Sequence, residues 1–142
     1  APGGTGGRSS KPHVLKSALG ADGQSTPEVQ PTVTHDPHIS AGNLATMKRA
    51  LLDVTQSGTG AAIFSGFHIP VAGKTGTAQV ANKDDFAFFA CYAPADSPRY
   101  AVVVVIEQGG HGGSVAGPAA RQILSKLFNI TWRRGHSVDL ST

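Results

Sequence analysis

Residues 71–80, with the sequence VAGKTGTAQV, contain the most informative pattern in the chain. Their threonines and valines favour an extended strand, and Gly-Lys-Thr-Gly-Thr occupies positions 73–77. A phosphate-binding loop also contains Gly-Lys-Thr, but it needs a glycine five positions earlier and a helix directly after the lysine. This chain has His68 at the earlier position and a strand-forming sequence after the lysine. We therefore interpret the segment as a strand at the edge of a cleft and not as a nucleotide site.

Two more strands are expected after this segment, at residues 84–94 (DDFAFFACYAP) and 99–108 (RYAVVVVIEQ). The connections between the three strands are short and rich in turn-forming residues, which predicts antiparallel hairpins. The second and third strands are apolar at consecutive positions, so both of their faces would be buried. We therefore expect layers of structure on both faces of this sheet.

One helix is expected before the sheet. Ser40 is a suitable N-cap residue, and Gly58 is suited to end the helix. Apolar residues recur between them at helical spacing and predict a single buried stripe. The stripe consists of Leu44, Met47, Leu51 and Val54.

A second helix is expected after the sheet. The run GGHGG at residues 109–113 predicts a loop, and Pro118 is expected in the first turn of the helix that follows. The predicted buried stripe of this helix comprises Ala116, Ala120, Ile123, Leu124 and Leu127.

The two ends of the chain have a different character. Residues 1–10 are rich in glycine and serine and predict a flexible segment, and residues 133–142 predict a polar tail. Residues 11–24 predict a short strand leading into a turn, with a return over residues 25–33 that its prolines weaken. The run HDPH at residues 35–38 could suggest a metal ligand pair, but the proline favours a solvated turn.

Composition excludes several classes of protein. The net charge is +3, and the basic residues are scattered along the chain, which does not fit a nucleic-acid-binding surface. A single cysteine, Cys91, rules out an internal disulfide and a cysteine-rich metal site, and its apolar surroundings predict a buried, inert thiol. No stretch of the sequence is long and apolar enough to span a bilayer.

Four quoted segments together resemble one known family. VAGKTGTAQV, FAFFACYAPAD, YAVVVVIEQGGHGGSVAGPAARQIL and the upstream MKRALLDVTQSGTG are similar to the closing part of the penicillin-binding transpeptidase domain, and most similar to its class B-like members. The similarity extends from about residue 11 to about residue 128. It implies an α+β fold in which helices cover an antiparallel sheet, as in the C-terminal part of the β-lactamase/transpeptidase-like fold. Residues 11–132 would then form an incomplete transpeptidase domain.

The resemblance also implies a reaction and a location. Members of the family are peptidoglycan D,D-transpeptidases, which cross-link stem peptides ending in D-Ala-D-Ala through a serine nucleophile that β-lactams also acylate. The resemblance implies neither a cofactor nor a metal. It places the activity outside the cytoplasm, in a parent protein anchored in the bacterial cell membrane. Whether the parent also has a glycosyltransferase domain stays open.

The same resemblance assigns roles within residues 73–77. Lys74 would provide the positive charge that the substrate's terminal carboxylate needs, and the hydroxyls of Thr75 and Thr77 would donate hydrogen bonds to that carboxylate. Gly76 would let the substrate approach the backbone closely, and the Thr77 N–H would serve the oxyanion hole. Lys74 and Thr77 are thus the catalytic candidates, and Thr75, Gly76 and Thr77 the substrate-binding candidates. The alternative is a plain surface strand with a solvated lysine.

Two further motifs of the family are absent from this sequence. No serine is followed three residues later by lysine, and Ser-x-Asn does not occur. The chain is therefore expected to be a C-terminal piece that lacks the nucleophile and is inactive alone, with the missing N-terminal part of the same domain as its partner. Removing that part would expose the third strand as a sheet edge through which a homodimer could form, unless residues 11–19 fold over it.

Other interpretations stay open at this point. The chain could come from a serine β-lactamase or a β-lactam sensor domain, or it could be a non-catalytic peptide-binding module. His111 could line the cleft or simply belong to a turn. Asp84 and Asp85 are interpreted as a polar pair in a hairpin rather than as an acid–base pair.

Overall fold

The computed structural model describes residues 7–130 of the chain. The chain divides into two compact units, Ala1–Ala45 and Thr46–Thr142, which are described separately. The predicted polar tail at 133–142 and the first six residues of the predicted flexible segment lie outside the described residues. None of the helices within residues 7–130 is long and apolar enough to cross a membrane.

The first unit contains one small antiparallel pair of strands, β1 (Ser9–Ser10) and β2 (Val33–His35). Ser9 and Ser10 lie in the segment predicted to be flexible, but they pair with β2. The expected strand, turn and return between residues 11 and 33 are present only as a loosely paired loop, closed by the bridge between Leu19 and Ser25. Prolines in the returning half cannot donate to a ladder, which explains why few regular pairs form.

Helix α1 (Ala41–Gln56) begins as predicted, since the Asn43 N–H donates to the Ser40 hydroxyl over 3.2 Å. It ends just before Gly58. The predicted apolar stripe is not buried, because Met47 is 59% exposed and the other stripe residues are only half-buried. Thr55 is the helix's one buried residue, and its hydroxyl donates to the carbonyl of Val71.

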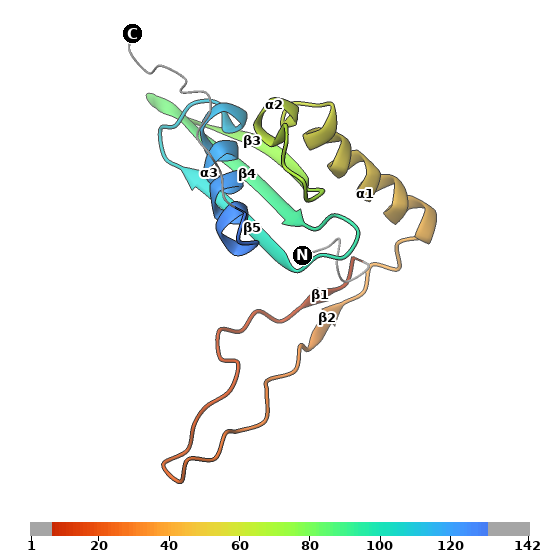
Figure 1. Ribbon diagram of the computed structural model, residues 1–142, viewed down its shortest axis with the longest axis vertical. Coiled ribbons are helices and arrows are strands. Elements are labelled where there is room, and N and C mark those ends of the chain that lie inside the picture. Colours follow the sequence, from red (N-terminus) through yellow and green to blue (C-terminus); the bar gives the residue numbers. More distant parts are fainter. Residues whose placement is uncertain (1–6, 131–142) are drawn as a thin grey trace. The chain divides into compact units, whose positions relative to one another are not determined.

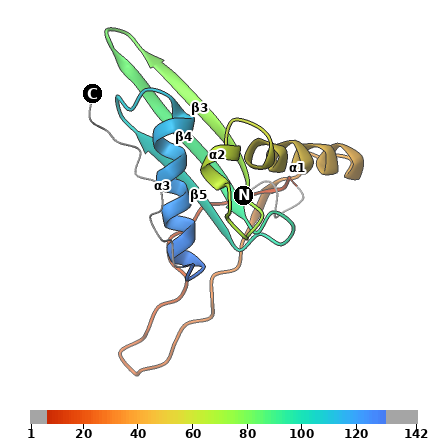
Figure 2. The ribbon, with the colours of Figure 1, turned by 45° about the horizontal axis from the view of Figure 1, so that its top comes forward.

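The predicted antiparallel sheet is confirmed. It consists of β3 (Ala72–Val80), β4 (Lys83–Ala93) and β5 (Tyr100–Ile106), in the spatial order β3-β4-β5 (Figure 1). The β3–β4 connection turns at Asn82, which has a φ of 60°. The tip of this hairpin projects beyond β5 and the neighbouring helix (Figure 2). The register places Thr75 opposite Phe89.

One face of the sheet carries the core. Helix α3 (Gly112–Leu127) lies across β4 and β5 on this face, and the short helix α2 (Ala61–Phe64) packs beside it (Figure 1). The ring of Phe64 stacks on that of Phe89 with centroids 5.7 Å apart. Cys91 is buried here, as predicted, and burial raises the pKa of its thiol to about 12, which disfavours the reactive thiolate.

The opposite face of the sheet is open, so the prediction of cover on both faces is wrong for the described residues. Val103 and Val105 on β5 point to this face and are 68% and 49% exposed. Helix α3, which packs on β4 and β5, lies on the other side, with Phe89 and Cys91. An apolar row of this kind exposed on a sheet is typical of a surface that another structure covers.

Helix α3 differs from its prediction in where it begins. It starts at Gly112, so the glycine-rich loop stops at His111 and Pro118 lies inside the helix rather than in its first turn. The buried row follows every fourth residue, through Gly112, Ala116, Ala120 and Leu124. Such a row drifts around a helix by about 40° per step, because 3.6 residues make one turn.

This drift corrects the predicted buried stripe of α3. Ile123 and Leu127 lie seven residues after Ala116 and Ala120. A spacing of seven does not follow the drift of the buried row, so by the end of the helix these two side chains lie outside the packed face. They are 42% and 39% exposed.

Arg121 on α3 connects this helix to α2. Its guanidinium donates to the carbonyl of Ile63 and lies 5.8 Å from the centroid of the Phe67 ring. Partial burial lowers the pKa of Arg121, because removing water disfavours the charged form. This contact holds the segment that connects α1 to β3 against the helix that covers the sheet.

Candidate functional site

The five residues 73–77 lie in β3, an edge strand of the described sheet. Residues 74–77 line a cleft of about 400 Å³. The rest of its wall comes from the α1–α2 connection and from the start of α3. Those additional lining residues are Thr59, His111, Gly112 and Gly113.

Strand alternation divides the predicted site residues between the two faces of the sheet. Thr75 and Thr77 point to the face that α3 covers, because they lie opposite Phe89 and Ala87, which are buried there. Lys74 points to the open face, and its ammonium donates to the carbonyl of Thr75 over 2.7 Å. A single ligand can reach donors on both faces only if it lies along the free edge of β3.

Thr59 is the one polar residue in the described lining of this cleft that the sequence does not predict. It follows α1, and its hydroxyl lies 3.3 Å from that of Thr75. Either hydroxyl can donate, so the pair can hold Thr75 in a fixed rotamer facing the cleft. A lone threonine in a turn gives no signal in the sequence, because its contact spans 16 positions.

The start of α3 packs directly on the backbone of the motif strand. A Cβ atom at Gly112 would lie 2.1 Å from the carbonyl oxygen of Gly76 and 2.4 Å from that of Phe88. Both atoms are backbone, so no side-chain movement could relieve the clash. A Cβ at Gly113 would meet only ordinary contacts, 3.7 Å from the Thr59 carbonyl oxygen and from Thr75 Cγ2. Position 112 therefore requires glycine, whereas position 113 does not.

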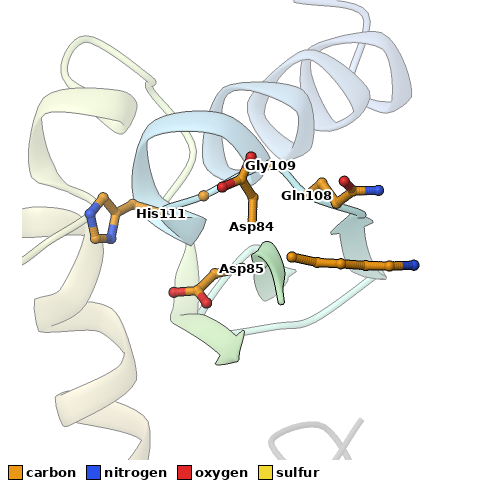
Figure 3. Close-up of a pocket in the computed structure, with 7 residues that line it drawn as sticks. Asp84, Asp85, Gln108, Gly109 and His111 are labelled. Atoms are coloured by element: carbon orange, nitrogen blue, oxygen red, sulfur yellow. The ribbon is translucent and has the colours of Figure 1, made fainter. Parts of the chain in front are cut away.

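His111 lies between this cleft and a second, polar cleft of about 470 Å³. The second cleft contains Asp84 and Asp85 at the start of β4, and the imidazole ring extends away from the Asp84 carboxylate (Figure 3). The Gly110 N–H donates to the Asp85 carbonyl over 2.9 Å, which ties the loop before His111 to β4. The structure thus places His111 on the cleft wall, one of the two alternatives open from the sequence.

The HDPH run forms a turn, in which the His38 N–H donates to the Asp36 carboxylate over 2.9 Å. Among residues 7–130, no group of three or more histidine, cysteine, aspartate or glutamate side chains is arranged to hold a metal ion.

Comparison with known families gives one match over most of the chain. Residues 4–125 match the penicillin binding protein transpeptidase domain. Curated relatives include the peptidoglycan D,D-transpeptidase MrdA of Haemophilus influenzae, which is 32% identical over 87% of this chain and 21% of its own length. The penicillin-binding protein PbpB of Mycolicibacterium smegmatis is 35% identical over 92% of this chain and 22% of its own length.

Solved structures agree with the sequence comparisons. The D,D-transpeptidase domain of a peptidoglycan glycosyltransferase from Eggerthella lenta superposes with a TM-score of 0.76 and 31% identity, over 91% of this chain and 30% of that one. The predicted α+β fold, the C-terminal part of the transpeptidase-like architecture, is thereby confirmed. The chain spans about a fifth of the length of the curated relatives that it matches.

The contact of Gly112 with β3 can be tested by two neighbouring substitutions. We expect Gly112→Ala to lower the free energy of unfolding by roughly 1–3 kcal/mol, the usual cost of overpacking. Gly113→Ala is the matched control. It should leave the free energy of unfolding unchanged or raise it by up to about 1 kcal/mol, because alanine has a higher helix propensity than glycine. Urea denaturation of the chain measures both, and equal effects of the two substitutions would contradict the packing described here.

Proposed function

The chain belongs to the penicillin-binding protein transpeptidase family, and from this membership we propose that it is the C-terminal portion of a peptidoglycan D,D-transpeptidase domain. The observation that supports this most is the cleft on β3. Lys74, Thr75 and Thr77 line it together, and no acidic residue lies among its described lining. Such a cleft is suited to the terminal carboxylate of a peptide.

In the proposed reaction, a serine outside this chain attacks the carbonyl of the penultimate D-Ala. The new ester bond forms as the peptide C–N bond breaks, and the terminal D-Ala leaves with the serine's proton on its amine. An amine of a neighbouring stem peptide then attacks the ester and releases the serine. The Thr77 N–H donates to the oxyanion of each tetrahedral intermediate.

Lys74, Thr75 and Thr77 have a positioning part in this scheme. Lys74 attracts the substrate's terminal carboxylate, and the two threonine hydroxyls donate to it from the α3 side of the strand. A substrate bound along the free edge of β3 meets all three groups at once. Because Gly76 has no side chain, the peptide can approach the backbone there, and an extended peptide can also pair with the strand edge.

The catalytic serine belongs to a part of the domain that lies outside this chain, since neither Ser-x-x-Lys nor Ser-x-Asn occurs among the 142 residues. The curated relatives are D,D-transpeptidases and penicillin-binding proteins, which does not favour an origin of this chain in a β-lactamase or a sensor domain. We place the parent protein outside the bacterial cytoplasm, anchored in the cell membrane, with stem peptides and β-lactams as its ligands.

The experiment that tests this function is labelling with a fluorescent penicillin followed by a denaturing gel. The longer protein that contains this chain should acquire one stoichiometric covalent label, because it includes the serine. The chain alone should acquire none. A labelled band from the chain alone would show that a nucleophile exists within it, and an unlabelled longer protein would contradict the proposed function.

Lys74→Ala in the longer protein should slow acylation by penicillin by about 100-fold or more. Losing a charged contact in a cleft costs a few kcal/mol, and about 2.7 kcal/mol corresponds to 100-fold. Stopped-flow acylation kinetics measure the effect. Lys83→Ala is the matched control, because Lys83 is an exposed lysine on β4 that lies outside this cleft. Similar kinetics for both variants would leave Lys74 as an ordinary surface lysine.

The isolated chain should self-associate through β5. This strand pairs with β4 on one side and ends the described sheet on the other, and its exposed valines add an apolar surface. Sedimentation velocity should show a rising average mass as concentration increases, and Val103→Lys should shift it toward monomer, because charge on an edge strand opposes pairing. A monomer at every concentration, or association that Val103→Lys leaves unchanged, would rule out pairing through β5.

A further inference from the structure

We propose that His111 is a specificity-determining residue of this cleft, whose imidazole donates a hydrogen bond to the terminal carboxylate of the donor peptide. This inference rests on the proposed function and adds a residue that lies outside the motif strand. Its basis is the place of His111, at the junction between β5 and α3 and on the wall of the cleft that contains Lys74 and Thr75.

The orientation of the ring supports this role. The imidazole extends away from the Asp84 carboxylate (Figure 3), and among the described residues no ion pair joins His111 to Asp84 or Asp85. Thr75 and Thr77 point to the face of the sheet on which α3 packs. His111 is the residue just before α3, so its side chain and the two threonine hydroxyls approach a ligand from the same side of β3.

The helix does not use this side chain. His111 occupies the N-cap position of α3, where serine, threonine, aspartate or asparagine would hydrogen-bond the first turn. The His111 ring makes no capping hydrogen bond. Instead, the hydroxyl of Ser114 donates to the His111 carbonyl over 3.0 Å, so the contact that organises this turn involves the backbone of residue 111. The imidazole, which is exposed, therefore remains available to a ligand.

The backbone on both sides of His111 is fixed to the sheet. On one side, the Gly110 N–H donates to the carbonyl of Asp85 over 2.9 Å. On the other side, Gly112 packs so closely on the carbonyls of Gly76 and Phe88 that no side chain fits. His111 is consequently held within one residue of a direct contact with the motif strand. A group held in this way can bind a ligand without the entropy cost of ordering a loop.

The chemistry of the cleft selects the ligand group. Every polar side chain along its described lining can donate a hydrogen bond: Thr59, Lys74, Thr75, Thr77 and His111. An imidazole has at least one N–H donor in each of its tautomers and two when protonated. Several donors facing one space fit a group that only accepts, and a carboxylate is the only such charged group of a peptide. We therefore assign the terminal carboxylate, and not an amine of the acceptor peptide, to His111.

The test compares two donor peptides in the longer protein that contains this chain. One peptide ends in D-Ala-D-Ala with a free carboxylate, and the other ends in the corresponding carboxamide. For each, kcat/KM of D-Ala or D-alaninamide release is measured in the wild type, His111→Ala and His111→Gln. His68→Ala is the matched control, because His68 is an exposed histidine outside this cleft. Penicillin labelling and thermal unfolding confirm that each variant is folded.

We expect the wild type to prefer the carboxylate peptide, and His111→Ala to reduce that preference by roughly 10-fold to 100-fold, the range for a hydrogen bond to a charged group. His111→Gln should retain part of the preference, since its amide also donates, and His68→Ala should retain all of it. If His111→Ala keeps the full preference, or slows both peptides equally, the role of His111 is wrong. If the wild type shows no preference or no turnover, the proposed function itself fails.

Discussion

The arrangement of the cleft depends on one close approach, that of Gly112 to the carbonyl oxygens of Gly76 and Phe88. Any Cβ at position 112 would overlap backbone atoms of two adjacent strands, so the first residue of α3 can lie directly on the sheet only as glycine. This contact fixes where α3 begins. It therefore fixes which residues of the helix reach the core, and it holds the residues around position 111 beside the motif strand.

The second unit is packed on one side only. The face under α3 contains fully buried Phe89 and Leu124, whereas the other face leaves Val103 largely exposed, and the apolar stripe of α1 leaves Met47 in solvent. These exposed rows belong to segments whose sequences are apolar in the pattern of buried elements. The relatives are about five times longer than the aligned chain, and in the proposed enzyme both rows are suited to contacts with other parts of the domain.

The sequence predicted whatever depends on local chemistry. Ser40 is recognisable as a cap because its hydroxyl acts within one turn, and the three strands are recognisable from apolar residues next to turn-forming ones. The site residues in β3 were placed in the right element, although their roles remain predictions. Predictions failed where contacts between residues far apart in the sequence determine the structure. Gly112 is helical because of its position on β3, and Thr59 joins the cleft through its contact with Thr75. Periodicity showed that the Met47 stripe is apolar, but it cannot show whether anything covers it.

The division of donors between two faces of β3 has a consequence for binding strength. Thr75 and Thr77 face the covered side, whereas Lys74 is exposed on the open side, where water weakens its attraction for a carboxylate. Lowering the effective dielectric constant from about 80 to about 20 strengthens that attraction roughly fourfold. A segment that covered the open face would exclude water from Lys74 and so strengthen its attraction for a carboxylate. In the proposed enzyme, the part of the domain outside this chain therefore supplies both the nucleophile and the dry surroundings in which Lys74 can bind its ligand.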